Sequence, residues 1–501
     1  MRYKNTYITI EKSLFEDLEK SINKHNLHYS KDDPNKIMMD KAVFFIDYIR
    51  YQRSFRKDEI TNGGYIRIPS KFLNIYLQKE LRKYKDFLIG HNYIKTIPYS
   101  KDESKSYGYL VSFSGTKKSN EESLEEYSAY EFLSQTYETF LSKSLEKHAK
   151  IEHKKSVADK STKHLTKWLN AESIQINRER AITFIDHSKD LSMEQKTSYS
   201  YSVNKIWFGC WYYLRSTNDN RLHSNLTNLP SELRKFVSHK TQNLVSLDIK
   251  SSQPFLLAGV FNLILLEETE KVAYLKSGLR SQDVKNQFSS VMNSISLEPS
   301  VIAGLQHYIN LVCNQDIYNY IASNLNSNFI EKLKDEKGYV DKVYSPTTNR
   351  KEEKHFKDLR GYCKVLTLEY MYSSAENTEK RLNEINQVLP DAVNKFIYEF
   401  KYCKELEIPK RQGKKRRTKR QREKIQKTKK LFAKFLQQLE AFIMLDIITK
   451  ELSKQNLKMF MATIHDSIIV TSGNEKEVEL FMKKKVFEIL GLEPEIKWEY
   501  W

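Results

Sequence analysis

The sequence predicts an α+β protein in which helices pack around a small antiparallel sheet, with a separate small domain in front. Two apolar strand-like segments, 244–248 and 459–472, provide the sheet, and helical apolar spacing dominates the segments around them. The first 115 residues show their own succession of helix and strand signals. A chain of 501 residues is long enough for two to four domains, each with its own core.

The segment 1–115 has the outline of a winged helix-turn-helix domain. Residues 37–50 have helical apolar spacing, and 66–97 have the pattern of a short strand, two helices and another strand. Residues 104–113 supply a last strand after a charged turn. Helix, helix and a two-stranded hairpin together predict docking to DNA or to a protein. A small α+β packing module is the alternative that the same pattern allows.

The segment 116–215 is expected to be mainly helical. It begins rich in Lys, Glu, Ser and Tyr, with few glycines. Within it, residues 119–150 show long helical periodicity, which predicts a helix that projects from the body of the protein.

Positive charge is concentrated in one tract. The chain has 83 Lys and Arg against 64 Asp and Glu, a net charge of +19. Between 410 and 430, thirteen of 21 residues are Lys or Arg and one is Glu. Such a run self-repels until it meets a polyanion, so it predicts contact with nucleic-acid phosphates, which carry no base-sequence information. A charged membrane surface satisfies the same charge balance. The tract is densest at Lys414, Lys415, Arg416 and Arg417.

Cysteine usage and hydropathy exclude several classes of protein. The four cysteines are far apart and form no C-x-x-C pair, so neither a zinc site nor a disulfide framework is expected. The N-terminus lacks the apolar core of a signal peptide. No segment approaches the roughly 20 apolar residues that span a bilayer. We therefore expect a cytoplasmic protein with no membrane partner.

Two aspartates stand beside the predicted strands. Leu244, Val245 and Leu247 make a buried strand that ends at Asp248, and two apolar half-strands flank Asp466. A carboxylate at the end of a buried strand is costly unless it is paired or binds a cation. Taken singly, such an aspartate is more often a surface or capping residue than a metal ligand.

With the segments around them, these aspartates form a recognisable series. Asp248 is followed five positions later by Gln253, and the later hairpin carries His465 next to Asp466. The segment 359–374 between them has Arg, Lys, Leu and Tyr at steps of four, which places them on one helix face. The order and spacing resemble the palm motifs of A-family DNA polymerases and of the single-subunit phage RNA polymerases. The resemblance covers roughly residues 205–501 and also includes the segments 221–230 and 436–444.

The resemblance implies a right-hand polymerase fold: a palm with an antiparallel sheet, helical fingers and a thumb, here preceded by the winged-helix-like domain. The sheet would pair 244–248 with the 459–472 hairpin, and the C-terminal residues 496–501 would add an edge strand. The implied divisions are a thumb-like region 116–215, a palm at 216–270 and 433–501, fingers 271–400 and a basic insertion 401–432.

The resemblance also implies two-metal phosphoryl transfer to a primer 3′-hydroxyl on a DNA template, from dNTPs or NTPs. Hard cations prefer carboxylate oxygens, and rigid strands would hold them in place. The implied roles are these: Asp248, Asp466 and the backbone carbonyl of Ile249 bind two Mg²⁺ ions, or Mn²⁺; Arg360 and Lys364 hold the triphosphate; Lys364 protonates the leaving pyrophosphate; Tyr372 and Gln253 contact the incoming nucleotide; Arg221, Asn225, Asn228, Gln437 and His465 contact primer and template.

The sequence departs from the family pattern at several points. Ser373 stands where Gly usually follows the fingers Tyr, and Leu368 replaces an aromatic residue or Met. The interval from Asp248 to Arg360 is wide for a bacterial DNA polymerase. A second register, Arg350, Lys354, Asp358 and Tyr362, is poorer because Asp358 would put a charge on the apolar face.

The nature of the product stays open between DNA and RNA. Gln253 is bulky and polar, as in the DNA-making members, which usually carry Glu there to close the sugar pocket against a 2′-hydroxyl. Ser467 after His465-Asp466 is instead the RNA polymerase form. We favour a DNA polymerase, without proofreading because no exonuclease motif set precedes the palm.

Two alternatives remain. One is a single-subunit RNA polymerase or primase-like enzyme. The other is a non-catalytic DNA-binding replication or regulatory protein, in which the aspartates are structural. A helix-turn-helix at the N-terminus would suit a replication or mobile-element polymerase that is recruited to particular DNA.

Overall fold

A computed structural model describes residues 7–55, 60–61, 63–77, 80–99, 106–112, 127–131, 155–191, 193–207, 209, 211–345, 350–373, 379–402 and 430–501. The densest part of the basic tract, Lys414 to Arg417, lies outside the described residues. So does most of the segment 119–150.

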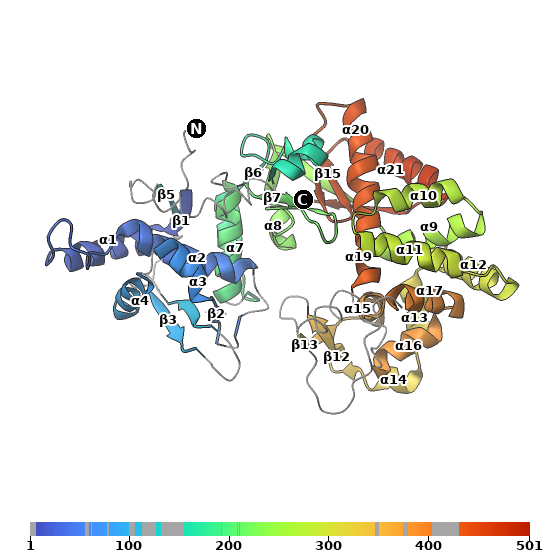
Figure 1. The fold of residues 1–501 in the computed structure, drawn as a ribbon, viewed down its shortest axis with the longest axis horizontal. Coiled ribbons are helices and arrows are strands. Elements are labelled where there is room, and N and C mark those ends of the chain that lie inside the picture. The colour runs from blue at the N-terminus through green and yellow to red at the C-terminus, as the bar shows by residue number, and fades with distance from the viewer. Residues whose placement is uncertain are drawn as a thin grey trace.

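The N-terminal part is a helical unit with a small sheet (Figure 1). Its three-stranded antiparallel sheet has the order β2-β4-β3, and a second pair joins β1 to β5. The core combines Leu, Ile and Val side chains with aromatic rings, among which Phe45, Tyr84, Tyr93 and Tyr109 are at most 1% exposed. The elements in chain order are β1 (Tyr7–Glu11), α1 (Lys12–Asn26), α2 (Met39–Phe55), β2 (Ile66–Arg67), α3 (Ser70–Leu77), α4 (Leu81–Gly90), β3 (Ile94–Ile97), β4 (Gly108–Val111) and β5 (Tyr127–Glu131).

The predicted elements of this part are confirmed: helix 37–50 is α2, the 66–97 pattern is β2, α3, α4 and β3, and the last strand is β4. The prediction of a projecting helix over 119–150 is wrong at 127–131, the part of this segment that the structure describes. Residues Tyr127–Glu131 form β5, which pairs antiparallel with β1 in the register Tyr7↔Glu131. A partner strand about 120 positions away provides hydrogen bonds that no local periodicity reveals.

A connecting region follows, and its helix α7 contacts α2 and β1 of the N-terminal part. Figure 1 shows α7 between that part and the larger C-terminal part. The region consists of a helix at 155–166, β6 (Gln175–Ile176), α6 (Arg178–His187), α7 (Met193–Trp207), β7 (Tyr213–Arg215), β8 (Leu222–Ser224) and α8 (Ser231–Arg234).

An antiparallel sheet forms the centre of the C-terminal part. Its order is β14-β15-β10-β9-β6, and β16 pairs with the other side of β10. A two-residue turn, Lys240-Thr241, joins β9 to β10 with φ values of 45° and 72°, the left-handed conformation that such turns need. The predicted pairing of 244–248 with both the hairpin and the C-terminal strand is confirmed. The strands are β9 (Val237–His239), β10 (Gln242–Ile249), β14 (Ala462–Ile464), β15 (Ser467–Thr471) and β16 (Ile496–Tyr500).

Helix α9 (Ser252–Leu265) is the most buried helix near this sheet. Twelve of its fourteen residues are buried, so other elements cover it on every side. It contacts α19 (Leu431–Ala441) and α21 (Glu475–Leu490). At Gly259 a Cβ would lie 2.7 Å from Leu490, so this close helix contact requires glycine. Between α19 and α21 the chain forms the π-helical turn η3 (Phe442–Ile448) and α20 (Thr449–Gln455).

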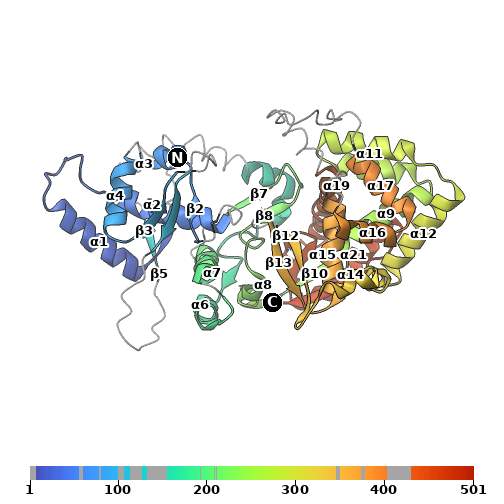
Figure 2. The ribbon, with the colours of Figure 1, turned by 90° about the horizontal axis from the view of Figure 1, so that it is seen from below.

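The part between α9 and α19 is mostly helical but contains a sheet that the sequence did not predict. Strands β11, β12 and β13 form it, and Figure 2 shows β12 and β13 side by side. Val343 and Phe356 are buried apolar side chains of these strands. Strand β13 reads RKEEKHF, so it lacks the apolar alternation that marks a strand. The elements are α10 (Thr269–Gly278), α11 (Gln282–Ser294), α12 (Pro299–Cys313), α13 (Ile317–Asn324), α14 (Ser327–Glu331), β11 (Lys334–Asp335), β12 (Gly338–Ser345), β13 (Arg350–Phe356), α15 (Leu359–Tyr372), α16 (Lys380–Val388) and α17 (Asp391–Lys401).

This sheet decides between the two registers of the Arg-Lys-Tyr series. Arg350 and Lys354 lie on β13, and Asp358 caps the N-terminus of α15 by accepting a hydrogen bond from Gly361 N at 2.6 Å. Arg360, Lys364 and Tyr372 share α15. The preferred register is therefore the one that lies on a single helix.

Two general expectations can be compared with the described residues. Among them no helix is both long and apolar enough to cross a membrane. Cys313 and Cys363, the two cysteines that lie in the described part, are free thiols.

Candidate active site

Asp248 lies near the end of the central strand of the sheet. Leu244, Val245 and Leu247 of β10 are fully buried, and Asp248 stands opposite Ser467 of β15. The strand is hydrogen-bonded on both sides at this point, because β16 pairs with it from the other edge. The carboxyl group is thus attached to a rigid part of the backbone.

Asp466 occupies the turn between β14 and β15, adjacent to the strand that pairs with Asp248. His465, the other turn residue, has a φ of 53°, a conformation uncommon for any residue but glycine. Ser252 Oγ, at the start of α9, donates a hydrogen bond to Asp466 Oδ2. Backbone strain of this kind is often found at functional sites, where the surrounding structure stabilises it.

The two carboxyl groups are close enough to influence each other strongly. The pKa of Asp248 is raised to about 7, first by burial and then by the negative charge of Asp466, while Lys364 acts in the opposite direction. Part of the shift comes from a hydrogen bond to Asp466 that only a protonated acid can donate. Oδ1 of Asp248 is buried and has no hydrogen-bond partner among the described residues.

Helix α15 presents one face to this pair. Its other face, with Tyr362, Cys363, Leu366, Thr367 and Met371, is buried in the core. Lys364 is exposed, and its charge acts on Asp248. Tyr372, at the last turn, lies within electrostatic range of Arg221 and Asp466, and burial raises its pKa.

Arg360 is engaged elsewhere in this structure. Its Nε and Nη2 donate to Asp316 Oδ2 at 3.0 and 2.7 Å, and its guanidinium lies 5.6 Å from the ring centroid of Tyr318. The side chain is 37% exposed, so it lies at the rim of the site. Its predicted contact with a triphosphate requires that this ion pair opens.

A buried ion pair lies beside the aspartates. Arg221 donates from Nε and Nη2 to the two carboxylate oxygens of Glu440, each at 2.8 Å. Gln253 Nε2 donates to the same carboxylate, while Gln253 Oε1 is buried without a partner among the described residues. Glu440 is 1% exposed. Burial raises the pKa of Glu440, and the Arg221 guanidinium acts in the opposite direction by stabilising the carboxylate.

His465 lies near this ion pair. The pKa of His465 is lowered to about 4, first by burial and then by the positive charge of Arg221, so the imidazole is neutral at pH 7. Its ring centroid is 6.2 Å from that of His223 on β8. His465 therefore presents an uncharged ring next to Asp466.

The structure does not place the remaining predicted contacts at the aspartates. Asn225 Oδ1 accepts a hydrogen bond from Tyr212 N at 2.7 Å, and Asn228 Nδ2 donates to Ser224 O at 3.4 Å. Both bonds shape the loop after β8. Gln437 is partly exposed on α19, one position before the buried Gln438. Their contacts with nucleic acid remain predictions.

The donor set at Asp248 and Asp466 fits a divalent cation. Within the described ranges no cluster of three or more His, Cys, Asp or Glu could hold a metal ion by itself. Asp248, with its raised pKa and its oxygen unpartnered among the described residues, lies beside a second carboxylate, and a hard cation would neutralise this pair. In sites of this kind, substrate phosphates and water commonly complete the coordination shell of the metal ion. The contribution of the Ile249 carbonyl remains a prediction.

Sequence reasoning missed three residues that shape the site. Glu440 was detectable as the lone acidic residue within the apolar run LQQLEAFIM, since a buried acid needs a partner. Ser252 was detectable as a small polar residue at the start of a buried helix. Lys401 gave no local signal; its buried ammonium donates to Tyr370 O and, at 3.2 Å, to Ser373 Oγ at the end of α15.

Comparisons with known proteins give limited information. No protein-family model matches the chain, and no curated protein matches it in sequence. Among solved structures, the chain is similar to the POL domain of Pol1 from M. smegmatis in complex with DNA primer-template and dNTP, at 13% sequence identity and a TM-score of 0.36. The similarity covers 65% of this chain and 56% of that chain, so the chain spans little more than half of that protein's length.

Proposed function

We propose that the protein is a template-dependent nucleotidyltransferase, a DNA polymerase that extends a primer 3′-hydroxyl. The observation that carries the proposal is the meeting of Asp248, Asp466 and Lys364 from three separate elements, β10, the β14–β15 turn and α15. In this interpretation the sheet with β10 is the palm and the part with α15 is the fingers.

The residues of the chain have distinct tasks in such a reaction. Two Mg²⁺ ions, or Mn²⁺, held by Asp248 and Asp466 would stabilise the attacking oxygen and the leaving pyrophosphate. Lys364 is exposed and lies within electrostatic range of Asp248, so it would bind the triphosphate and give a proton to the pyrophosphate. Arg360 would add a second cation once it leaves Asp316. Phosphoryl transfer depends mainly on such positioning and electrostatics.

The network at Gln253 supports DNA as the product. Glu440 fixes the Gln253 amide, and this bulky polar side chain five positions after Asp248 would close the sugar pocket against a 2′-hydroxyl. Arg221, on the other side of Glu440, would contact the primer-template duplex, with His465 and Gln437 near the primer end. Ser467 remains the feature that favours an RNA polymerase or a primase-like enzyme.

The test is extension of a labelled primer on a DNA template with Mg²⁺, in separate reactions with dNTPs and NTPs. We expect extension with dNTPs by the wild type and none by the Asp248→Ala/Asp466→Ala double variant. Faster extension with NTPs than with dNTPs would show that the product is RNA and not DNA. Intact DNA binding without extension under any primer or nucleotide would favour the non-catalytic replication or regulatory protein.

The parts outside the site have proposed roles of their own. The N-terminal part has the succession of a winged helix, namely α2, β2, α3, α4 and the β3–β4 hairpin, and would dock to nucleic acid. The basic tract would hold template or product through phosphates. Such additions suit a polymerase of a replication system or mobile element.

A further inference from the structure

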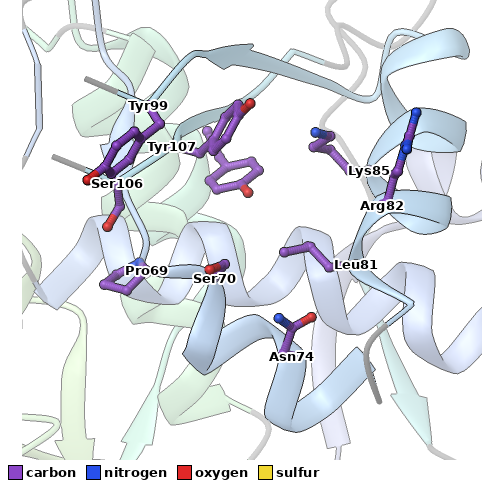
Figure 3. A pocket seen from close by; sticks show the side chains of 10 residues that line it. Pro69, Ser70, Asn74, Leu81, Arg82, Lys85, Tyr99, Ser106 and Tyr107 are labelled. Atoms are coloured by element: carbon purple, nitrogen blue, oxygen red, sulfur yellow. The ribbon is translucent and has the colours of Figure 1, made fainter. Parts of the chain in front are cut away.

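The N-terminal part contains a groove that the proposed polymerase chemistry does not use. It has a volume of about 560 Å³ and lies between α3, α4 and the ends of the β3–β4 hairpin. Ser70 and Asn74 contribute from α3, Arg82 and Lys85 from α4, and Tyr99 and Tyr107 from the hairpin side. Figure 3 shows the tyrosines and the two cations on opposite sides of one open space.

The backbone around the groove is held firmly. Arg67 donates from Nη1 to Pro98 O at 3.1 Å and to Ser106 O at 2.6 Å, which ties the two ends of the hairpin loop together beside the groove. At Gly108 a Cβ would lie 2.5 Å from the Ile97 side chain, so the two strands approach closely there. The positions of Tyr99 and Tyr107 thus depend on well-packed strands.

The two tyrosines expose ring surface to solvent. Tyr99 is 49% exposed and Tyr107 is 38% exposed, whereas Tyr109 at the base of the groove is 1% exposed. The Lys85 ammonium lies 4.8 Å from the Tyr107 ring centroid, so a flat cationic or aromatic group fits against this ring. Exposed aromatic rings in a basic groove are the usual platform for unpaired bases.

The groove carries positive charge that a ligand can reach from solvent. None of the described residues that line it is acidic. Arg82 is 92% exposed, and its ion pair to Asp86, at 3.6 Å, is at the surface and therefore weak. Lys83, by contrast, donates to Pro34 O and Lys36 O and serves the fold. Arg82 and Lys85 are the cations that a phosphate can reach.

The outward face of α4 is less suited to reading a duplex. Besides Arg82 and Lys85 it exposes Asp86 and Ile89, and neither Asn nor Gln, the residues that read adenine in the major groove, is present. A carboxylate in the middle of this face would also repel the phosphates. In a duplex the base faces are stacked on one another and cannot reach the tyrosines.

We propose that this groove binds an unpaired nucleotide of a single-stranded nucleic acid. Tyr99 and Tyr107 stack on the base, Arg82 and Lys85 bind the adjoining phosphates, and Ser70 and Asn74 offer hydrogen bonds to the base or sugar. Lys85 leaves the Tyr107 ring when a base takes its place. This site is independent of nucleotidyl transfer at Asp248 and Asp466.

The affinity of the full chain for a fluorescent single-stranded oligonucleotide tests the proposal. Tyr99→Ala and Tyr107→Ala should each weaken binding about tenfold, because stacking on one aromatic ring accounts for roughly that factor. Tyr107→Phe should bind like the wild type, since stacking needs the ring and not the hydroxyl. Arg82→Gln should weaken binding and reduce its salt dependence. Lys20→Ala, an exposed cation on α1, is the matched control and should have no effect.

Photo-crosslinking separates this groove from other nucleic-acid contacts. A strand with 5-iodouracil should crosslink to peptides that contain Tyr99 or Tyr107, and an unlabelled single strand should compete better than a duplex or a mononucleotide. Primer extension on a short template should be unchanged in all the variants, which also shows that they fold. Equal binding by Tyr99→Ala and the wild type, an equal loss in Tyr107→Phe and Tyr107→Ala, or stronger competition by duplex would each overturn the proposal.

Discussion

Two groups of partly buried carboxylates in the C-terminal part have opposite electrostatics. Around Arg381, at the start of α16, Asp341, Glu369 and Glu379 all form ion pairs with one guanidinium, which is 8% exposed. At Asp248 and Asp466, two acids lie side by side, and burial and mutual repulsion raise the pKa of Asp248. The first group has its counter-charge in direct contact. At the second, Lys364 acts on Asp248 without an ion pair among the described residues, and Arg221, which acts on Asp466, is paired with Glu440.

This difference distinguishes acids that stabilise the fold from acids that serve a function. The Arg381 group connects α16 to α15 and β12, and tyrosine Tyr362 donates to Asp341 at 2.9 Å as a further support. The Asp248 group is an arrangement that folding alone does not favour, since like charges are brought together near the end of a strand. Such an arrangement is expected where a cationic ligand completes the site.

The largest effect on stability is expected at Arg381. Arg381→Met leaves three carboxylates without their shared counter-charge, and breaking a buried ion pair in this way costs roughly 3–5 kcal/mol. Chemical denaturation should show this loss. Arg180→Met, an exposed arginine on α6, is the control and should change the free energy of unfolding by less than about 0.5 kcal/mol. Equal stability of the two variants would show that the Arg381 group is not structural.

Addition of Mg²⁺ should stabilise the wild type, because it neutralises the Asp248 group. At a concentration 100 times its dissociation constant, the gain is about 2.7 kcal/mol. The thermal midpoint should therefore rise with Mg²⁺ in the wild type and in Arg381→Met, but not in Asp248→Asn. An equal rise in Asp248→Asn would place the ion elsewhere.

The same stabilisation should depend on pH. The folded pKa of Asp248, about 7, lies above its ordinary value of 3.8, so the folded chain binds more protons than the unfolded chain between these values. Without metal, the contribution of Asp248 to stability is therefore lost as pH rises from about 4 to 7. The Mg²⁺-induced shift of the thermal midpoint should grow over the same window, because the cation needs the ionised form. Midpoints measured at pH 5, 6, 7 and 8 check this, and a shift independent of pH would contradict it.

Glu440→Gln should have an intermediate effect. It leaves Arg221 with a buried uncompensated charge, which should cost about 2 kcal/mol of stability. It also frees Gln253, so discrimination between dNTPs and NTPs should fall roughly tenfold, the value of one positioning hydrogen bond. Glu477→Gln, an exposed acid on α21, serves as the control. Loss of stability with unchanged discrimination would limit Glu440 to a structural role.

The smallest effect on stability is expected from Asp248→Asn. The substitution removes one of two repelling charges, so the metal-free protein should become more stable by about 1 kcal/mol, as is common where an active site sacrifices stability for function. Denaturation without metal measures this. A loss of stability would mean that Asp248 is bound into the fold like the acids around Arg381.

The sequence predicted the elements whose signal is local. Strand β10 and the 459–472 hairpin are apolar runs, and the steps of four in α15 place Lys364 and Tyr372 on one face. Elements that depend on distant partners were missed. Strand β5 depends on β1, and β13 has no apolar residue before its last position. Glu440 acquires its meaning only from Arg221, 219 positions earlier.

The most direct test is the rate of nucleotide addition in a single turnover, compared among the wild type, Asp248→Asn and Arg381→Met at a temperature where circular dichroism shows all three folded. We expect Asp248→Asn to be slower by on the order of 10³-fold, because an electrostatic group at the reacting centre is lost. The rate of Arg381→Met should stay within about tenfold of the wild type, because the substitution lowers stability and does not change the groups at the reacting centre. Nucleotide addition by Asp248→Asn at the rate of the wild type would contradict the account.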